Sequence, residues 1–117
     1  MDDCLACPAL DVAAALEYVG GDRELLRELL IMFGEDAPGY LAALHRGLDD
    51  ANAGDLMKAA HTLKGSLRAL GARKAAALAE DLEQIGRAGG LDGAAHLLAR
   101  LDQEITRVLH AAAEPIV

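Results

Sequence analysis

DLMKAAHTLKGSLRAL, residues 55–70, is the stretch of sequence that decides the fold. Apolar residues recur in it every three or four positions, the spacing that places them on one side of an α-helix. They are Leu56, Ala59, Ala60, Leu63, Leu67 and Leu70. Gly71 follows directly and can end the helix. The stretch therefore predicts a helix over about residues 55–70 with one buried face.

Two helical segments are expected before this helix. Asp11 can cap a short helix over residues 12–19, which the glycine pair at positions 20–21 ends. Asp22 can start a long segment whose apolar residues keep the same spacing. These residues are Leu25, Leu26, Leu29, Leu30 and Phe33, followed by Leu41, Leu44 and Leu48.

Pro38 interrupts the long segment. Proline lacks a backbone N–H, and its ring clashes with the preceding turn of a helix. We therefore expect Pro38 to kink the helix or to divide it near residues 35–37. A turn at residues 52–55 should then lead into the next helix.

Two more helices are expected after Gly71, over about residues 73–88 and 92–113, with a glycine pair between them. Their apolar residues are Ala75, Leu78, Leu82 and Ile85 in the first, and Leu97, Leu98, Leu101, Ile105, Val108 and Leu109 in the second. Because the connections are short, consecutive helices should pack antiparallel. The sequence thus predicts an all-α fold, an antiparallel up-down four-helix bundle with a short additional N-terminal helix.

The composition agrees with a single helical domain. The chain has 117 residues, of which 53% are hydrophobic but only 3% aromatic, so strands have little to be built from. We expect one domain over residues 1–117, with residues 1–9 as a flexible N-terminal segment and residues 114–117 as a C-terminal tail.

Charge and motifs exclude several classes of function. The formal net charge of −8 argues against a nucleic-acid partner and against anionic lipid. No apolar stretch approaches the ~20 residues of a membrane span, and the start lacks a secretion signal, so the cytoplasm is expected. Cys4 and Cys7 have the spacing of a redox pair or half a zinc site, but no second pair exists. We expect two reduced thiols there.

His61 points almost directly away from the apolar face of its helix. Its outward side is shared by Lys64, Gly65 and Arg68, and by Met57 and Lys58 one turn earlier. An imidazole in water is largely neutral and nucleophilic at physiological pH. The ammonium of Lys64, one turn away, could reach phosphoryl oxygens on the ring, and Gly65 leaves room for a partner. An ordinary solvated face has the same pattern, so helical spacing alone leaves both interpretations open.

The segment Ala60-His61-Thr62-Leu63-Lys64-Gly65-Ser66, followed by Leu70-Gly71-Ala72, closely resembles the phosphorylation motif of histidine phosphotransfer (HPt) domains. Residues 21–33 are similar to the family's opening helix pair. Leu78, Leu82, Glu83 and Arg87 stand where the family's next helix carries its leucines and polar end. The resemblance covers most of residues 10–108 and is strongest over residues 60–72.

This resemblance implies a phosphorelay function. HPt domains accept a phosphoryl group from the aspartate of a response-regulator receiver domain and pass it to another receiver, without ATP-dependent kinase activity. In agreement, the sequence has no glycine-rich phosphate loop of the P-loop kind. The resemblance implies His61 as the nucleophile and Lys64 as the stabilising cation. The receiver would supply the aspartate and Mg²⁺, and the chain would have no cofactor of its own. A hybrid sensor kinase is the other expected partner, and a monomer the expected state.

Docking to the receiver is expected around His61. Arg68, Met57, Lys58 and Gly65 share its face, and Arg87 matches a family position that is often basic, although its wheel position indicates solvent. Leu67 and Arg68 depart from the small or polar residues usual in the family. We interpret Leu67 as core and expect Arg68 to influence partner choice.

Two other classes of function stay open. A haem- or metal-binding bundle needs inward ligands, whereas His61 points outward and no Glu-x-x-His pair occurs. A helical docking module would use the same face without phosphorylation. His45, His96 and His110 lie in no recognisable motif and are expected at the surface.

Overall fold

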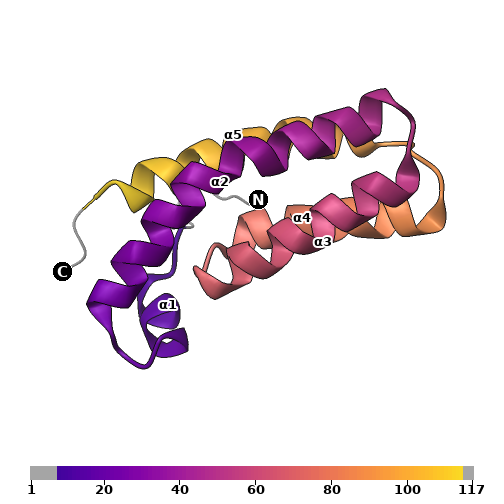
Figure 1. The fold of residues 1–117 in the computed structure, drawn as a ribbon. Helices are drawn as coiled ribbons and strands as arrows, with labels where there is room; N and C mark the ends of the chain where they lie inside the picture. The colour runs from indigo at the N-terminus through magenta and orange to yellow at the C-terminus, as the bar shows by residue number, and fades with distance from the viewer. Residues whose placement is uncertain (1–7, 115–117) are drawn as a thin grey trace.

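Five helices make up the computed structural model, which describes residues 8–114 (Figure 1). They are α1 (Val12–Tyr18), α2 (Arg23–Asp49), α3 (Ala53–Ala69), α4 (Arg73–Ala88) and α5 (Ala94–Ala112). Helices α2 to α5 run alternately up and down, each packed against two of the others, and α1 lies at one end beside the start of α2. The predicted all-α bundle with a short additional N-terminal helix is therefore confirmed.

The first three helices each begin at a side chain that accepts a backbone N–H. Asp11, Asp22 and Asn52 accept at 3.0 Å from the amide three residues ahead. Such a cap is worth about 1 kcal/mol, because it satisfies a donor that the first turn leaves free. Asn52 was expected in a turn that extends to Asp55. It instead caps α3, which begins earlier, at Ala53.

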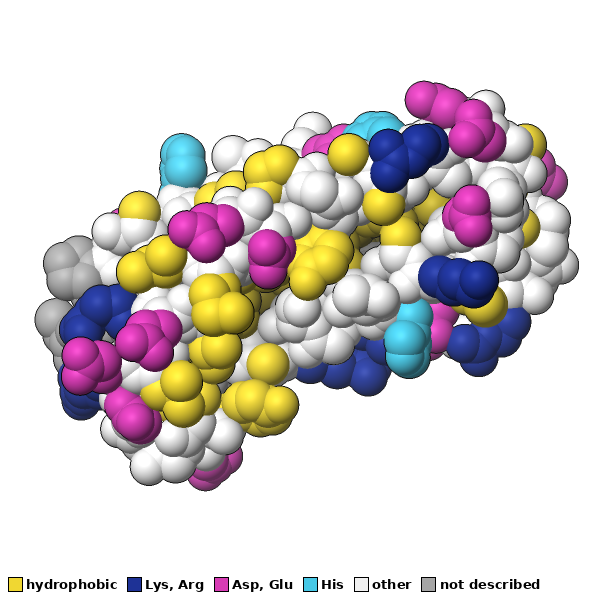
Figure 2. Space-filling model, in the orientation of Figure 1, with side chains coloured by type: hydrophobic (Ala, Val, Ile, Leu, Met, Phe, Trp, Pro, Cys, Tyr) yellow, Lys and Arg dark blue, Asp and Glu magenta, His cyan; other side chains and the backbone are white. Residues whose placement is uncertain are grey.

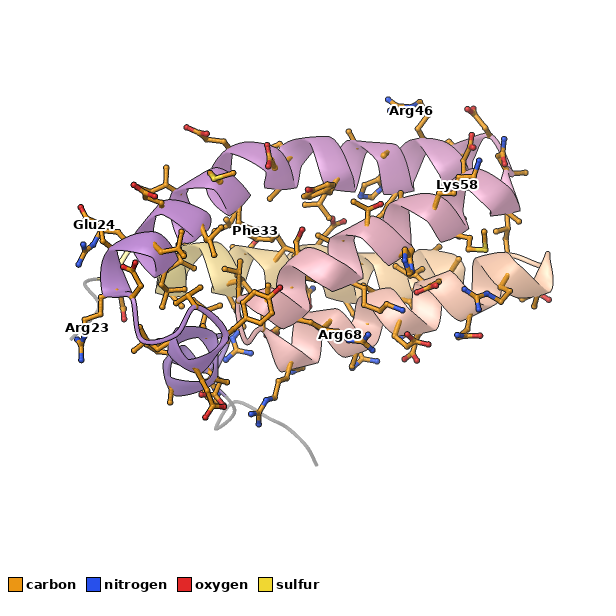
Figure 3. The ribbon with its side chains drawn as sticks, turned by 60° about the horizontal axis from the view of Figure 1, so that its bottom comes forward. Arg23, Glu24, Phe33, Arg46, Lys58 and Arg68 are labelled. Atoms are coloured by element: carbon orange, nitrogen blue, oxygen red, sulfur yellow. The ribbon has the colours of Figure 1, made fainter. Side chains whose placement is uncertain are left out.

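Pro38 does not divide α2, which is continuous through it. Figures 1 and 3 show α2 bent between its two halves. Of the two possibilities expected from the sequence, a kink or a break, the structure therefore has the kink. The Pro38 ring is exposed, while Phe33 and Leu44 on either side are buried. Burial of both halves against the same core holds them in one helix despite the missing hydrogen bond.

The core is built from aliphatic side chains of all four long helices. The largest fully buried ones are Leu26, Leu44, Leu56, Leu63, Leu67, Leu82, Leu98, Leu101, Ile105 and Val108. Helices α3 and α4 make the most extensive contact in the bundle. Leu67 is core, as predicted.

Gly86 lets α3 and α4 approach closely at one end. A Cβ at this position would lie 2.8 Å from the Ala53 carbonyl oxygen and 2.9 Å from the Met57 nitrogen, and backbone atoms cannot yield to it. This close approach brings the last turns of α4 beside the first turns of α3.

The N-terminal boundary differs from the prediction. Ala9, assigned above to a flexible segment, is buried together with Leu10. Cys4 and Cys7 lie outside the described residues. Among residues 8–114, none of the helices combines the length and the hydrophobicity of a membrane-spanning segment.

Candidate functional site

His61 lies on the outward side of α3, and its side chain is 68% exposed. The ring nitrogen Nδ1 lies 3.0 Å from Oε2 of Glu83, which comes from the facing helix α4. The Glu83 side chain is only 2% exposed. The ring therefore stands in solvent, while a buried carboxylate holds one of its nitrogens.

The charge of Glu83 determines which nitrogen of His61 carries the proton. A hydrogen bond from Lys64 holds the pKa of Glu83 below its ordinary value of 4.5, against the opposing effect of burial, and His61 lowers it further. An ionised carboxylate can only accept hydrogen bonds, so Nδ1 must donate. The lone pair of the neutral ring is then on Nε2, for which the described residues provide no partner.

The prediction that Lys64 stands exposed beside the imidazole is wrong. Its side chain is only 11% exposed; Nζ lies 2.8 Å from Oε1 of Glu80 and is ion-paired with Oε1 of Glu83. A helical wheel shows which side of α3 is apolar, but it does not show which neighbouring helix covers the edges of that side. Lys64 lies one turn after the buried Ala60, at the edge that α4 covers. Hydrogen bonds that Lys64 donates to Glu80 and then to Glu83 raise the pKa of Lys64 above its ordinary 10.5. Lys64 in turn lowers the pKa of Glu80.

Arg87 belongs to the site, although its position on a helical wheel of α4 predicts only that its side chain faces solvent. Its Nη2 donates to Oε2 of Glu83 at 2.7 Å, and the side chain is 57% exposed. His61 contacts the same carboxylate oxygen. The guanidinium therefore lies next to the imidazole, with most of its five donors directed elsewhere.

A shallow hollow beside His61 joins several of the predicted docking residues. It is lined by Met57, Lys58, His61, Thr62, Glu83 and Arg87. Met57 is partly buried and Lys58 is exposed. The hollow thus combines an apolar wall with two exposed cations around the imidazole.

Gly65 and Arg68 face outward, as predicted. A Cβ on Gly65 would meet no other atom within 4 Å. Arg68 is exposed, and its Nη2 lies 3.7 Å from Oε1 of Glu80. Figure 3 shows Lys58 and Arg68 toward opposite ends of α3. The surface on either side of His61 is therefore open and carries positive charge.

A second hollow, mostly apolar, lies between α2 and α3. Its lining residues are Leu29, Met32, Phe33, Asp36, Tyr40, Ser66, Ala69 and Leu70. Figure 2 shows hydrophobic side chains gathered at the neighbouring end of the molecule. The large exposed ones are Val12, Tyr18, Leu25, Ile31 and Met32, all on α1 or the first half of α2. The apolar hollow reaches the outward face of α3 at Ser66, next to Gly65.

Two site residues, Glu80 and Glu83, were not identified from the sequence as functional. Glu83 was noted only as part of the family resemblance. A usable signal existed, because Glu83 falls among Ala79, Leu82 and Gly86, which are all buried on α4. A carboxylate within an apolar stripe requires a partner, and such residues are candidates for a functional site.

The other histidines lie apart from this cluster. His45 pairs with Asp102 at 2.9 Å on an exposed part of the surface, and His96 and His110 are exposed. Within residues 8–114, no group of three or more His, Cys, Asp or Glu side chains is arranged to hold a metal ion.

Comparisons with known proteins agree with the arrangement of α3 and α4. The Hpt domain family model matches residues 28–111. The fold is similar to the crystal structure of histidine-containing phosphotransfer protein B from Pseudomonas aeruginosa PAO1, with a TM-score of 0.84 and 27% identity. That match covers 92% of this chain and 93% of the other. No curated protein sequence matches the chain significantly. The family match includes both helices that carry the His61 cluster.

Proposed function

Because the chain belongs to the Hpt domain family, it is a histidine phosphotransfer protein of a phosphorelay, and we propose that His61 carries the phosphoryl group. One observation supports this choice of residue above the others: an exposed imidazole whose Nδ1 is held by the buried carboxylate of Glu83. That contact directs the Nε2 lone pair to solvent. His45, by contrast, contacts the partly exposed carboxylate of Asp102.

The proposed step forms one bond and breaks one. The Nε2 lone pair attacks the phosphorus of an aspartyl phosphate on a receiver domain, the N–P bond forms, and the P–O bond breaks to release the aspartate carboxylate. The ring becomes an imidazolium, because Nδ1 keeps its proton. Glu83, 3.0 Å from Nδ1, balances that positive charge. Transfer to a second receiver reverses these steps.

Charge neutralisation would come from both proteins. Phosphoryl transfer depends mainly on positioning and on cations that meet the oxygens of the transferred group. Lys58 and Arg87 line the hollow beside His61 and expose their charges there. The receiver would contribute its Mg²⁺ and aspartate, and this chain would need no cofactor of its own.

We propose that receiver domains dock over α3, with the open surface at Gly65 under the incoming backbone. Arg68 and Met57 lie on the same surface, and the apolar hollow between α2 and α3 adjoins it at Ser66. The proposed partners are response-regulator receivers and a hybrid sensor kinase, in the cytoplasm, with this chain as a monomer.

The test is phosphoryl transfer from phosphorylated receiver domains of the same organism to the purified chain. We expect acid-labile phosphate on the parent and on His96→Gln, which removes another exposed histidine, but none on His61→Gln. Circular dichroism of His61→Gln should match the parent, because exposed substitutions change stability by no more than about 0.5 kcal/mol. Normal acceptance by His61→Gln would refute the assignment, and a parent that binds receivers without accepting phosphate would indicate a docking module.

A further inference from the structure

A third hollow, the arginine hollow, lies between α3 and α4 and does not include His61. It is lined by Arg68, Arg73, Ala76, Ala77 and Glu80. Arg68 lies near the end of α3 (Figure 3), and Arg73 is the first residue of α4. Their side chains are 62% and 77% exposed. The hollow therefore has small side chains at its base and one exposed guanidinium from each of two helices.

The positive charge of Arg68 is only weakly compensated within the chain. Its Nη2 lies 3.7 Å from Oε1 of Glu80, which is too far for a hydrogen bond. The same oxygen accepts a hydrogen bond from Lys64 at 2.8 Å. Arg68 can therefore turn toward an anion on another molecule, and Glu80 keeps its cation when it does.

Arg73 is held in place more firmly. Its Nη2 lies 2.8 Å from Oδ2 of Asp11, and the other oxygen of Asp11 accepts the amide of Ala14. The Asp11 amide in turn donates to the Gly71 carbonyl at 2.9 Å. A guanidinium has five N–H donors, so the contact with Asp11 positions Arg73 and leaves other donors for a second carboxylate.

The arginine hollow lies within reach of a protein that docks over His61. Arg68 follows His61 by seven residues, almost two full turns, so both side chains leave the same side of α3, about 10 Å apart along the helix. A standard interface buries about 800 Å² on each partner, so it would cover both places. The chain has a formal net charge of −8, and an acidic group on a partner is attracted only where cations gather locally.

We propose that Arg68 and Arg73 form a docking subsite for a carboxylate of the receiver domain, and that this contact selects among receivers. The inference rests on the proposed docking of receivers over α3. The partner group is an Asp or Glu side chain on the receiver surface, about 10 Å from the aspartate that exchanges the phosphoryl group. Two guanidiniums can hold one carboxylate by charge-assisted hydrogen bonds, whereas a receiver with Lys or Arg at that place is repelled.

The experiment measures the affinity of unphosphorylated receiver domains of the same organism for the parent, Arg68→Gln, Arg73→Gln and the double variant. Arg100→Gln is the matched control, because Arg100 is exposed and contacts no carboxylate among the described residues. It lies on α5, which packs mainly against α2 and α4. Each single change removes one positive charge, so the variants differ only in where that charge was.

We expect each single variant at the arginine hollow to bind the preferred receivers roughly two- to fivefold more weakly, the range of exposed ion pairs. The double variant should lose more than either, and Arg100→Gln should stay near the parent. The losses should shrink at high salt, because added ions screen exposed charges. Receivers that bind the parent weakly should change less, so the order of preference among receivers should narrow.

Asp11→Asn separates docking from a purely structural role of Arg73. Asn caps a helix as well as Asp does, so α1 should keep its cap, while Arg73 loses the carboxylate that competes with the receiver. Docking therefore predicts tighter binding by Asp11→Asn and weaker binding by Arg73→Gln. If the pair only stabilised the fold, both changes would weaken binding.

Equal losses in Arg100→Gln and in the variants at the arginine hollow, or losses that are the same for every receiver, would overturn the proposal. If Arg73→Gln does not fold, Arg68→Gln decides, because it gives up only the 3.7 Å contact with Glu80. A parent that binds receivers in the expected order but accepts no phosphate would refute the proposed role of His61 alone. A parent that binds no receiver would refute both.

Discussion

Glu83 has three partners at once in the His61 site. Its buried carboxylate contacts Lys64, His61 and Arg87, so two cations and an imidazole share one negative charge. A single carboxylate thereby links the buried side of α4 to the exposed ring on α3. None of this follows from residue spacing within one helix, because the contact depends on how α4 is rotated about its own axis.

Replacing Gly65 with a larger residue should leave stability unchanged or raise it, but should slow phosphoryl transfer. Replacement by Ala should stabilise the chain by up to about 1 kcal/mol, because Ala loses less backbone entropy in a helix. In the series Gly65→Ala, Gly65→Ser and Gly65→Gln, thermal unfolding should show stability near or above that of the parent, since a Cβ meets nothing within 4 Å. The rate of transfer from a receiver should fall as the side chain grows. Unfolding of Gly65→Gln would show that this face of α3 is packed rather than open.

At the scale of the elements, the helix boundaries were largely predictable. Asp11 and Asp22 cap where expected. The periodic apolar residues lie in the core or pack against it, except Leu25, which is exposed and was wrongly assigned to the buried face. The effect of Pro38 could not be settled from the sequence, because a kink and a break differ only in whether both halves are buried against the same neighbours. Lys64 was wrongly expected at the exposed surface for a related reason. Whether a residue at the edge of a helix face is buried depends on which neighbouring helix covers that edge.

The contact between α3 and α4 should be sensitive at Gly86. Gly86→Ala places a methyl group 2.8 Å from the Ala53 carbonyl oxygen, and the resulting strain should destabilise the chain by roughly 1–3 kcal/mol. Gly34→Ala is the matched control, because that helical glycine has no atom within 4 Å of a Cβ. Urea unfolding should show Gly34→Ala at or above the parent and Gly86→Ala below it. Equal stability of the two variants would mean that α3 and α4 are farther apart than described.

For the whole molecule, the buried charges predict a characteristic dependence of stability on pH. The pKa of Glu83 and that of Glu80 are lowered by Lys64, so their contribution is present above about pH 4.5 and is lost as the pH falls through their folded values. The pKa of Lys64 is raised by Glu80 and Glu83, so its contribution is present below pH 10.5 and is lost as the pH rises beyond its folded value. Stability from this cluster should therefore be constant between these limits.

Urea unfolding across the pH range, for the parent and for Lys64→Met, checks this dependence. The free energy of unfolding of the parent should fall at both ends of the range. In the variant the alkaline fall should shrink, because the titrating ammonium is gone, and the acid fall should shrink because the carboxyls lose the cation that lowers their pKa. Parallel curves for the two proteins would contradict the coupling of Lys64 to the two glutamates.

The family and the bundle could be inferred from the sequence because both depend on local features, namely helical spacing and the motif around His61. The contacts of Glu83 with Lys64 and His61 join residues on two helices, so they depend on how those helices are placed relative to each other. What the sequence does contain is a charged residue, Glu83, inside the apolar stripe of α4. That conflict with the apolar pattern of α4 marks the residue that contacts His61.

The most direct test of the account is to locate the phosphorus on the phosphorylated chain. Protein labelled with ¹⁵N at histidine is phosphorylated by a receiver domain, and coupling between ³¹P and the ring nitrogens is measured. We predict coupling to Nε2 of one histidine, absent from the His61→Gln protein, with Nδ1 protonated against Glu83. Coupling to Nδ1, or a phosphoryl group on any other residue, would contradict the account.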